Sequence, residues 1–360
     1  MFLTSPKLYS TMFTLDSSPP PRPEDIRLTQ FSHGAGCGCK IAPAVLAEIT
    51  RHNVFPDNDK LLVGHATNDD AAVYDLGQGR ALIATVDFFA PIVDDAFTYG
   101  QIAAANALSD VYAMGGKPLM AMAVLGWPTE KLPTVLAQRI MAGAKDICLQ
   151  AGVIIAGGHT IDSPEPFFGL SVNGEAPIAH IKQNSTAQAG DILFLTKPLG
   201  TGVLATALKR GLLPPDGMNE AISFMTQLNS IGEKMGALSF VHALTDVTGF
   251  GLLGHLIEMA EGAHLSASLT YASIPTLGQA KELSRQFIYA DNTMRNWKAY
   301  GEKTEGTNSE SMLLLSDPQT NGGLLAAVHP AEQHRFAALF PEAVAIGHMT
   351  NRQEKIVSVT

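Results

Sequence analysis

Two cysteines and a lysine stand close together in the stretch GAGCGCK, where Cys37 and Cys39 alternate with glycines and Lys40 follows. Glycine tolerates positive φ angles and resists regular structure, so the stretch predicts an exposed loop. A lysine beside a thiol lowers the thiol pKa and favours the nucleophilic thiolate. The loop is therefore a candidate for thiol chemistry, with Lys40 placed to assist either cysteine.

Three other interpretations of these cysteines compete with reactive chemistry. A Cys37–Cys39 disulfide would close a very small, strained ring. A zinc site needs about four ligands, and no second Cys or His pair stands nearby at ligand spacing. Incidental cysteines in a mobile loop also fit, because free cysteine is mostly a buried, inert residue. These residues alone do not separate reactive from incidental cysteines.

Four aspartates form a second group of candidates. Asp70, Asp87 and Asp246 lie at the ends of expected elements, and Asp110 lies in a helix that is otherwise nearly all apolar. A carboxylate in apolar surroundings is costly unless it is paired or bound to a metal. Oxygen ligands from separate segments are what Mg²⁺ on a nucleotide requires. The alternative is that they are ordinary turn and cap aspartates.

Glycine turns provide weaker signals for phosphate binding. Gly157-Gly158-His159-Thr160 follows an expected strand, and its backbone N–H groups could approach phosphates. A plain turn capped by His159 explains the same residues. No Walker A pattern occurs, and no GxGxxG follows a strand.

Hydrophobic periodicity predicts elements of both kinds in each half of the chain. The expected helices span 42–50, 99–114, 131–151, 218–235, 252–260 and 331–339. The expected strands include 81–86, 153–156, 167–172, 192–196, 243–246, 265–269, 324–328 and a last one over 343–347. A hairpin is expected at Gly77-Gln78-Gly79.

This mixture predicts an α+β protein of two domains. We expect a mobile N-terminal tail and glycine/cysteine loop over 1–48, a first domain over 49–176 and a second over 177–360. The proline-rich segment near residues 17–23 predicts disorder at the N-terminus.

Composition narrows the class of function. The 360 residues are 46% hydrophobic with a net charge of −10, which predicts a globular protein and disfavours nucleic acid or an anionic membrane as main partner. An acidic protein can still bind a polyphosphate through bridging metal ions. Three cysteines do not make a disulfide framework, so a cytoplasmic protein is expected. No apolar run approaches the roughly 20 residues of a membrane span, and no secretory signal core is present.

The combination of motifs is more specific than any one of them. LTQFSHGAGCGCK, ATNDDAAVYD, TVDFF, NALSDVYAMGGKP, AGGHTID, TDVTGFGLLGHL and DPQTNGGLL occur in order from about Arg27 to Gly347. Together they resemble the selenophosphate synthetase (selenide, water dikinase) family, of the aminoimidazole ribonucleotide synthetase-like superfamily. The later motifs are partly shared across that superfamily, whereas GCGCK points to this family.

The resemblance implies a two-domain α+β fold whose first domain dimerises through its sheet. It implies the reaction of ATP, selenide and water to selenophosphate, phosphate and AMP, supplying selenium for selenocysteine and selenouridine synthesis. Several Mg²⁺ ions would accompany ATP. The resemblance also allows a monovalent cation and a selenium-delivery protein.

Residue roles are implied by matching the motifs. Cys37 matches the catalytic cysteine, and Lys40 the essential lysine, which also binds ATP. Asp70, Asp110 and Asp246 match metal ligands. The remaining matches are nucleotide-binding positions, the last three expected from the partner subunit: Thr67, Asn68, Asp69, Asp87, Asp110, Gly158, His159 and Thr160.

Two departures and two rivals accompany the resemblance. Asn321 stands where the family usually has Ser, and the stretch 290–293 is less glycine-rich than expected. A superfamily cyclo-ligase or thiamine-phosphate kinase would lack the GCGCK loop. A non-enzymatic thiol or metal carrier would leave the four aspartates unexplained, and Mg²⁺-dependent nucleotide binding would exclude it.

Overall fold

The computed structural model describes residues 22–32, 34–36, 38, 40–41, 45, 48–49, 58–64 and 68–360. The predictions for the N-terminal tail, Cys37, Cys39 and Thr67 lie outside these residues. The helix expected over 42–50 is described only at 45, 48 and 49, which are helical. Two short 3-10 helices, η1 (Pro23–Asp25) and η2 (Leu28–Phe31), precede the glycine-rich loop.

The N-terminal half contains a six-stranded sheet in the order β1-β2-β3-β6-β4-β5. Neighbouring strands are antiparallel except β4 and β5, which are parallel. The strands are β1 (Leu61–Val63), β2 (Ala72–Gly77), β3 (Arg80–Phe89), β4 (Lys117–Trp127), β5 (Ile154–Asp162) and β6 (Phe167–Pro177). The predicted hairpin joins β2 to β3, and Gly77, Gln78 and Gly79 all take the positive φ that its turn requires.

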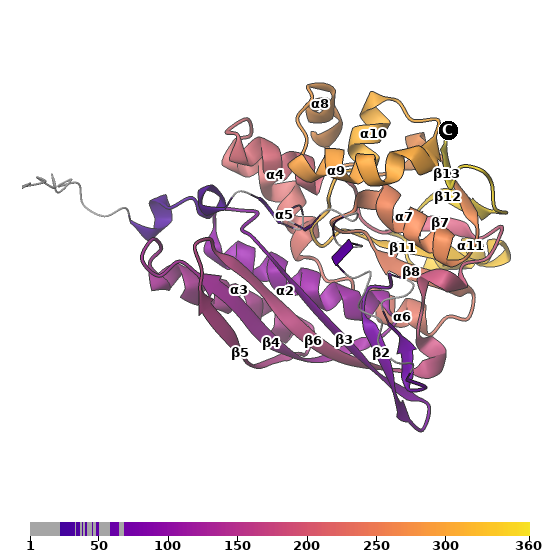
Figure 1. The fold of residues 1–360 in the computed structure, drawn as a ribbon, viewed down its shortest axis with the longest axis horizontal. Helices are drawn as coiled ribbons and strands as arrows, with labels where there is room; N and C mark the ends of the chain where they lie inside the picture. Colours follow the sequence, from indigo (N-terminus) through magenta and orange to yellow (C-terminus); the bar gives the residue numbers. More distant parts are fainter. Residues whose placement is uncertain are drawn as a thin grey trace, which may run out of the picture.

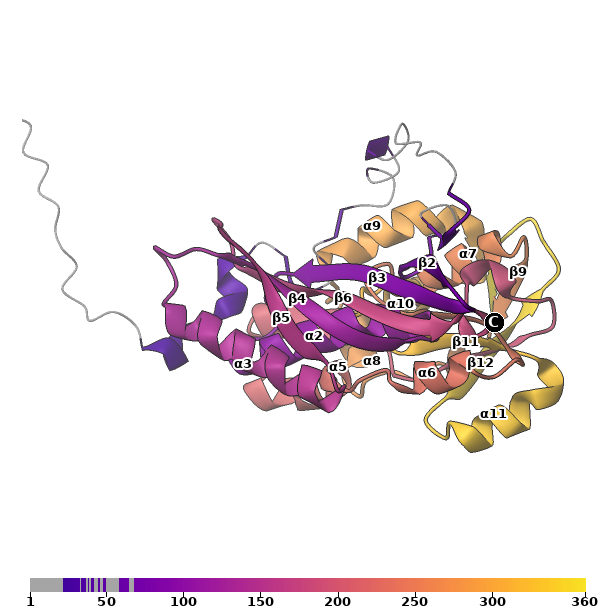
Figure 2. The same cartoon turned by 90° about the horizontal axis from the view of Figure 1, so that it is seen from below.

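Helices α2 (Ala96–Ala113) and α3 (Thr134–Gln150) cover one face of this sheet (Figures 1 and 2). They cross closely because Gly100 and Gly143 carry no side chain at the contact; a Cβ on Gly100 would lie 1.9 Å from the carbonyl oxygen of Ile140. Helix α2 is buried on nearly every side, as expected for a helix that is apolar all round. It therefore forms the centre of the N-terminal core.

The C-terminal half contains a seven-stranded sheet in the order β10-β13-β9-β12-β7-β11-β8. Its strands are β7 (Ile192–Leu195), β8 (Val241–Asp246), β9 (Ser266–Leu269), β10 (Thr304–Glu305), β11 (Leu324–Val328), β12 (Val344–Thr350) and β13 (Val357–Val359). Its helices include α4 (Thr201–Lys209), α5 (Asn219–Thr226), α6 (Ile231–Gly236), α7 (Gly251–Gly262), α8 (Ala280–Arg285), α9 (Asp291–Tyr300), α10 (Ser309–Leu315) and α11 (Gln333–Leu339). Among the described helices, none combines the length and the apolarity that crossing a bilayer requires.

The two halves share a hydrophobic core and do not meet at a hydrated interface. Val203 and Leu204 of α4 and Met225 of α5 belong to the same buried cluster as the apolar residues of α2 and β3. Loops and side chains at this junction are therefore held by elements from both domains.

Three sequence-based expectations are wrong in detail. The single helix over 218–235 is broken, because Gln227 is extended and the buried Asn229 turns inward to donate hydrogen bonds. The strand over 343–347 is not the last one, since β13 follows it. Gly157-Gly158-His159-Thr160 lies inside β5, so it is not a turn after a strand.

Candidate active site

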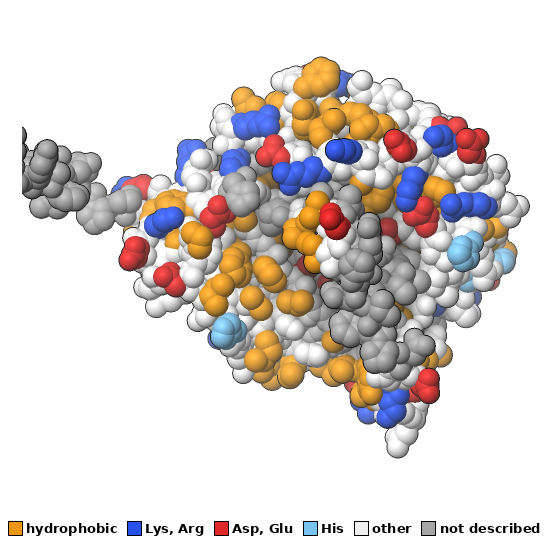
Figure 3. All heavy atoms as spheres, viewed as in Figure 1, with side chains coloured by type: hydrophobic (Ala, Val, Ile, Leu, Met, Phe, Trp, Pro, Cys, Tyr) orange, Lys and Arg blue, Asp and Glu red, His pale blue; other side chains and the backbone are white. Residues whose placement is uncertain are grey.

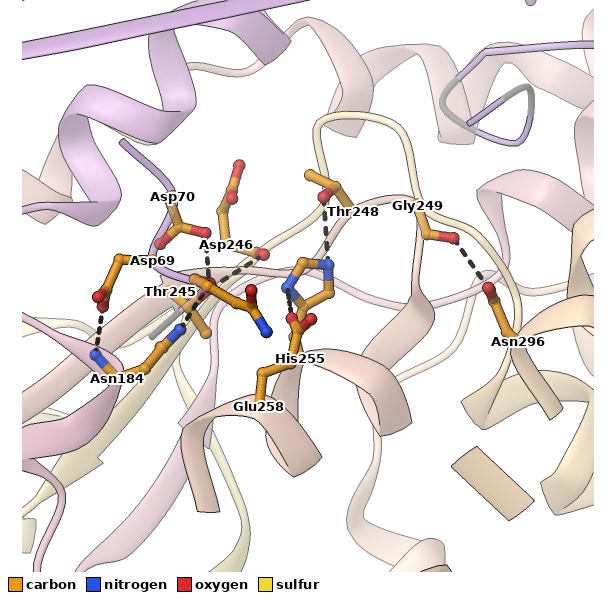
Figure 4. Close-up of polar contacts among 11 residues, drawn as sticks. Asp69, Asp70, Asn184, Thr245, Asp246, Thr248, Gly249, His255, Glu258 and Asn296 are labelled. Atoms are coloured by element: carbon orange, nitrogen blue, oxygen red, sulfur yellow. Dashed lines mark hydrogen bonds and ion pairs between the residues drawn. The ribbon is translucent and has the colours of Figure 1, made fainter. Parts of the chain in front are cut away.

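Four aspartates from separate segments converge where the two domains meet. Asp70 precedes β2, Asp87 lies within β3, Asp110 lies on α2 and Asp246 ends β8. Each of Asp70, Asp110 and Asp246 is close enough to at least one other aspartate of the four for its pKa to be affected. Figure 4 shows Asp70 and Asp246 side by side; Asp70 comes from the first domain and Asp246 from the second. The structure thus brings together Asp70, Asp110 and Asp246, and their role as metal ligands stays a prediction.

One face of α2 orients two of these carboxylates and carries a third. Asn106 Nδ2 donates to Asp87 Oδ2 at 2.7 Å, and Ser109 Oγ donates to Asp246 Oδ2 at 2.5 Å. Asp110 itself accepts a hydrogen bond from the Thr85 hydroxyl of β3. Because residues at i, i+3 and i+4 share a helix face, Asn106, Ser109 and Asp110 act from one surface.

Asp70 is held less completely than the others. Thr245 Oγ1 donates to Asp70 Oδ1 at 2.8 Å (Figure 4). Asp70 Oδ2 is buried and has no hydrogen-bond partner among the described residues. A buried carboxylate oxygen without a partner is costly, and a cation would remove that cost.

The buried carboxylates at this junction would be stabilised by positive charge. Asp110 is 7% exposed and Asp246 is 1% exposed. Burial, together with repulsion from neighbouring aspartates, raises the pKa of Asp70, Asp110 and Asp246. Lys40 supplies part of the missing charge, because its Nζ lies 3.3 Å from Asp87 Oδ1 and its charge opposes the rise in the pKa of Asp110.

Magnesium fits this donor set only with help from other ligands. Within the described ranges, no group of three His, Cys, Asp or Glu side chains is arranged to hold one ion. Mg²⁺ commonly binds one or two carboxylates and completes its octahedral shell with phosphate oxygens and water. The buried carboxylates and the unpartnered Asp70 oxygen therefore fit ions that are shared with a polyphosphate.

A pocket of about 470 Å³ opens beside Lys40 and Asp87. Its walls are largely apolar and include the aromatic rings of Phe88, Phe167 and Phe250. Apolar walls beside a few polar groups are typical of small-molecule sites. The pocket is large enough for a planar base next to the charged groups that would hold phosphates.

Buried polar groups behind the aspartates fix the junction. Lys197 Nζ donates to the carbonyls of Gln227 at 2.8 Å and Asn321 at 3.0 Å, and burial lowers the Lys197 pKa to about 7. Asn321 N in turn donates to Asn106 Oδ1 at 2.7 Å. Asn321 has a φ of 45°, a left-handed conformation that asparagine tolerates better than most residues.

The loop after Asp246 is held by a second buried network (Figure 4). His255 Nε2 lies 3.2 Å from Thr248 Oγ1, and His255 Nδ1 lies 3.7 Å from Glu258 Oε2. Burial lowers the His255 pKa to about 3 and raises that of Glu258 to about 8, so both are mainly neutral at pH 7. Asn296 donates to Gly249 O at 2.9 Å and steadies the same loop.

Other predicted nucleotide-binding residues occupy different surroundings. Asp69 Oδ1 accepts from Asn184 N at 2.7 Å, and the Asn68 carbonyl accepts from Asn184 Nδ2 at 3.1 Å. These bonds tie the segment before β2 to the start of the second domain. The stretch Gly158–Thr160 lies on β5, and β6 and β4 separate it from β3, so in this chain it is not beside Asp87.

Sequence reasoning missed several supporting residues. Asn106, Ser109, Asn229 and Thr245 orient the carboxylates or each other. A signal existed for two of them, because Asn106 and Ser109 interrupt an apolar helix at the spacing that places them beside Asp110. Asn229 had no such signal, since it lies in a break that the sequence did not predict.

Two family models and several curated proteins match most of this chain. The family model of the AIR synthase related protein, N-terminal domain, matches residues 68–176, and that of the C-terminal domain matches residues 188–360. The curated "Selenide, water dikinase" of Aeromonas salmonicida is 50% identical over 319 residues, covering 88% of this chain and 92% of that protein. The protein of the same name from Colwellia psychrerythraea is 51% identical over 318 residues, with the same coverage.

The chain belongs to the selenide, water dikinase family. The predicted superfamily and the two-domain fold are thereby confirmed. Solved structures agree on the fold of this family member. Thiamine-monophosphate kinase from Stenotrophomonas maltophilia is 20% identical with a TM-score of 0.61, covering 89% of this chain and 96% of that one. Hydrogenase maturation protein HypE in complex with ATP is 19% identical with a TM-score of 0.61, covering 93% and 94%.

Proposed function

We propose that this chain is a selenophosphate synthetase that converts ATP, selenide and water into selenophosphate, phosphate and AMP. The observation that carries the proposal is the convergence of Asp70, Asp110 and Asp246 next to Lys40, within a chain about 50% identical to curated members of the family. The expected product would supply activated selenium for selenocysteine and selenouridine.

The carboxylates would hold the ATP phosphates through Mg²⁺. Asp70, Asp110 and Asp246 would be the protein ligands, and bound Mg²⁺ would neutralise the charge of the phosphates. Phosphoryl transfer depends mainly on such neutralisation and on in-line positioning. The hydrogen bonds from Thr245, Thr85 and Ser109 supply the positioning by fixing one carboxylate each.

Lys40 and Cys37 would act on the transferred group and the selenide. Lys40 pairs with Asp87 in the structure, and from there its ammonium would stabilise negative charge on a phosphoryl oxygen or on the selenide anion. Cys37, three residues earlier, would receive or position the selenium, and Cys39 would have a lesser role. Closure of the glycine-rich loop over the nucleotide would exclude water from the reacting atoms.

A second copy of the chain would complete the assembly. Hydrophobic side chains are exposed on the sheet face opposite α2 and α3 and gather over its strands (Figure 3). Its exposed members include Val86 and Phe88 on β3, Met122 on β4 and Ile161 on β5. An exposed apolar patch of this kind usually marks an interaction site. Pairing of two such faces would let Gly158–Thr160 of one copy approach the nucleotide of the other.

The deciding experiment is phosphorus NMR of the protein with ATP, Mg²⁺ and selenide under anaerobic conditions. The expected result is a new phosphorus resonance from a P–Se bond, with AMP and orthophosphate in equal amounts. The matched control is the Asp246→Asn variant, which should form none of these three products. ATP hydrolysis without a P–Se product would refute the proposal, and so would the absence of nucleotide binding. A monovalent cation, a selenium-delivery protein and a cytoplasmic location stay predictions.

A further inference from the structure

The glycine-rich loop is attached to the first domain at both of its ends. Before it, Thr29 donates to Asp94 Oδ1 through its N–H at 3.1 Å and through its hydroxyl at 2.6 Å. Within it, Gly36 N donates to Ala90 O at 3.0 Å. At its end, Lys40 pairs with Asp87. These contacts place the loop along the edge of β3.

One lysine of the second domain donates two hydrogen bonds to the loop. Lys209 is the last residue of α4, and its Nζ donates to the carbonyl oxygens of Ser32 at 2.7 Å and Gly34 at 3.3 Å. Gln30 Nε2 lies 3.4 Å from the Lys209 carbonyl and adds a weaker contact in the reverse direction. Hydrogen bonds from a charged donor are roughly twice as strong as neutral ones.

A cavity of about 330 Å³ separates the loop from α4 around this lysine. Gly34, Ala35 and Gly38 form one wall, and Thr206 and Lys209 form another. The loop backbone is therefore not packed against the side of α4 at this cavity. The Lys209 side chain extends from α4 to the loop carbonyls, so these two hydrogen bonds are a specific mechanical link.

The surroundings of this ammonium act on its pKa in two opposing directions. Burial lowers the Lys209 pKa, and the negative charges of Asp291 and Glu165 oppose that effect. Asp291 begins α9 and lines the same cavity. The carboxylate of Asp291 is therefore one source of the negative charge that acts on Lys209.

We propose that Lys209 is a positioning residue for the reaction, which holds the first half of the glycine-rich loop against the second domain so that the second half presents Lys40 to Asp87. The inference rests on the proposed function only in assigning chemistry to the loop. Ser32 and Gly34 are the anchored residues, and they precede Cys37 by five and three positions. Without the link, the loop would keep its contacts along β3 but would lose the hydrogen bonds that reach Ser32 and Gly34 from α4.

Three variants test the link. Lys209→Met removes the ammonium and keeps most of the apolar stem, Lys209→Arg keeps a donor, and Arg210→Ala is the matched control. Arg210 follows Lys209 and lines the same cavity, but it donates no hydrogen bond to the loop residues that the structure describes. Thermal melting of each variant verifies that the fold is intact.

The first readout is kinetic. Lys209→Met should lower kcat for selenide-dependent AMP formation by about 10- to 100-fold, the loss expected when a reacting group is displaced by about 1 Å. The dissociation constant for Mg²⁺-ATP should stay within about twofold, because the aspartates that hold it are untouched. Lys209→Arg should restore most of kcat, and Arg210→Ala should match the unmodified protein.

The second readout does not depend on activity. Iodoacetamide labelling resolved by mass spectrometry should modify Cys37 and Cys39 several-fold faster in Lys209→Met. Buried Cys148, whose pKa burial raises to about 11, serves as the internal reference. Wild-type labelling rates and wild-type kcat in Lys209→Met would overturn the proposal, as would a parallel loss of Mg²⁺-ATP binding. If the unmodified protein made no selenophosphate, the proposed function would fail while the labelling comparison would still decide the role of Lys209.

Discussion

Asp317 carries a charge that the fold tolerates poorly. It is fully buried, and its Oδ2 accepts hydrogen bonds from Gly202 N at 3.0 Å, Val203 N at 3.3 Å and Gln319 Nε2 at 2.8 Å. Its Oδ1 has no hydrogen-bond partner in the described part of the chain. Burial raises the Asp317 pKa to about 7 despite these hydrogen bonds. Because the acceptor caps α4, the charge affects the helix that carries Lys209.

The sign of the pH effect follows from this raised pKa. An unfolded aspartate has a pKa of about 3.9, so between about pH 4 and pH 7 the folded state holds a proton that the unfolded state has lost. The free energy of unfolding therefore falls as pH rises through this window and levels off above about pH 7. At about 1.4 kcal/mol per pKa unit, the three-unit difference amounts to at most about 4 kcal/mol.

Asp317→Asn removes the charge and keeps an oxygen acceptor for the two α4 N–H groups. We expect the variant to be about 2–4 kcal/mol more stable than the unmodified protein at pH 8, with the difference shrinking toward zero near pH 4. Urea denaturation of both proteins without nucleotide, across about pH 4 to pH 9, measures the difference directly. The matched control is Asp216→Asn, a substitution at an exposed position in the same domain. The difference in unfolding free energy between this control and the unmodified protein should change little across the same pH range.

The way this stability difference changes with pH tests whether Asp317 binds a proton on folding. A difference that stays constant across the window would refute the reasoning, because it would show that Asp317 does not change its proton binding on folding. The reasoning would also be refuted if Asp317→Asn became less stable than the unmodified protein as pH rises. In that case the hydrogen bonds accepted by the Asp317 carboxylate would outweigh the cost of its buried charge.

Three further predictions test the site and the assembly. Asp246→Asn should weaken Mg²⁺-dependent nucleotide binding at least about tenfold by calorimetry, the loss seen even for groups that only support a metal ligand; unchanged affinity would count against the metal assignment. Cys37→Ser should abolish selenide-dependent AMP formation while nucleotide binding survives, and Cys39→Ser should retain much of the activity; the reverse pattern would exchange the two roles. Phe88→Glu should convert a dimer to a monomer by light scattering, whereas Leu339→Glu, an exposed position on α11, should not; a monomeric unmodified protein would contradict the proposed sheet pairing.

The fold could be predicted from local patterns wherever an apolar run or a turn signal marked an element. Helix α2 began and ended within a few residues of expectation, because its apolar run stops at Gly115, whose φ of 76° ends the helix. The β2–β3 hairpin followed from its turn residues. The break after α5 could not be predicted in this way. Helical propensity continues through Gln227, but Asn229 must reach Ser109 of the first domain and the carbonyl of Gly322, which is 93 residues away in the sequence, and neither partner is visible in the local pattern.

The same limit applies to the site. Asp110 stood out because a carboxylate within an apolar helix needs a partner, and the structure supplies Thr85 and the neighbouring aspartates. Gly157-Gly158 is not in the turn that the sequence predicts, because a glycine pair also suits a strand whose neighbour approaches closely. A Cβ on Gly158 would lie 2.3 Å from Ala123 O of β4, so packing against that strand accounts for this glycine.

Adjacent residues of α2 explain why the site forms at the domain junction. Asp110 accepts from Thr85 of the first domain, and Ser109, one position earlier, donates to Asp246 of the second. Side chains one residue apart on a helix diverge by about 100°, so one turn of α2 contacts both domains. Any change in how the domains pack would therefore move Asp246 relative to Asp110. A cation bound by both carboxylates would also hold the two domains together, so the proposed binding of Mg²⁺-ATP would be coupled to the packing of the junction.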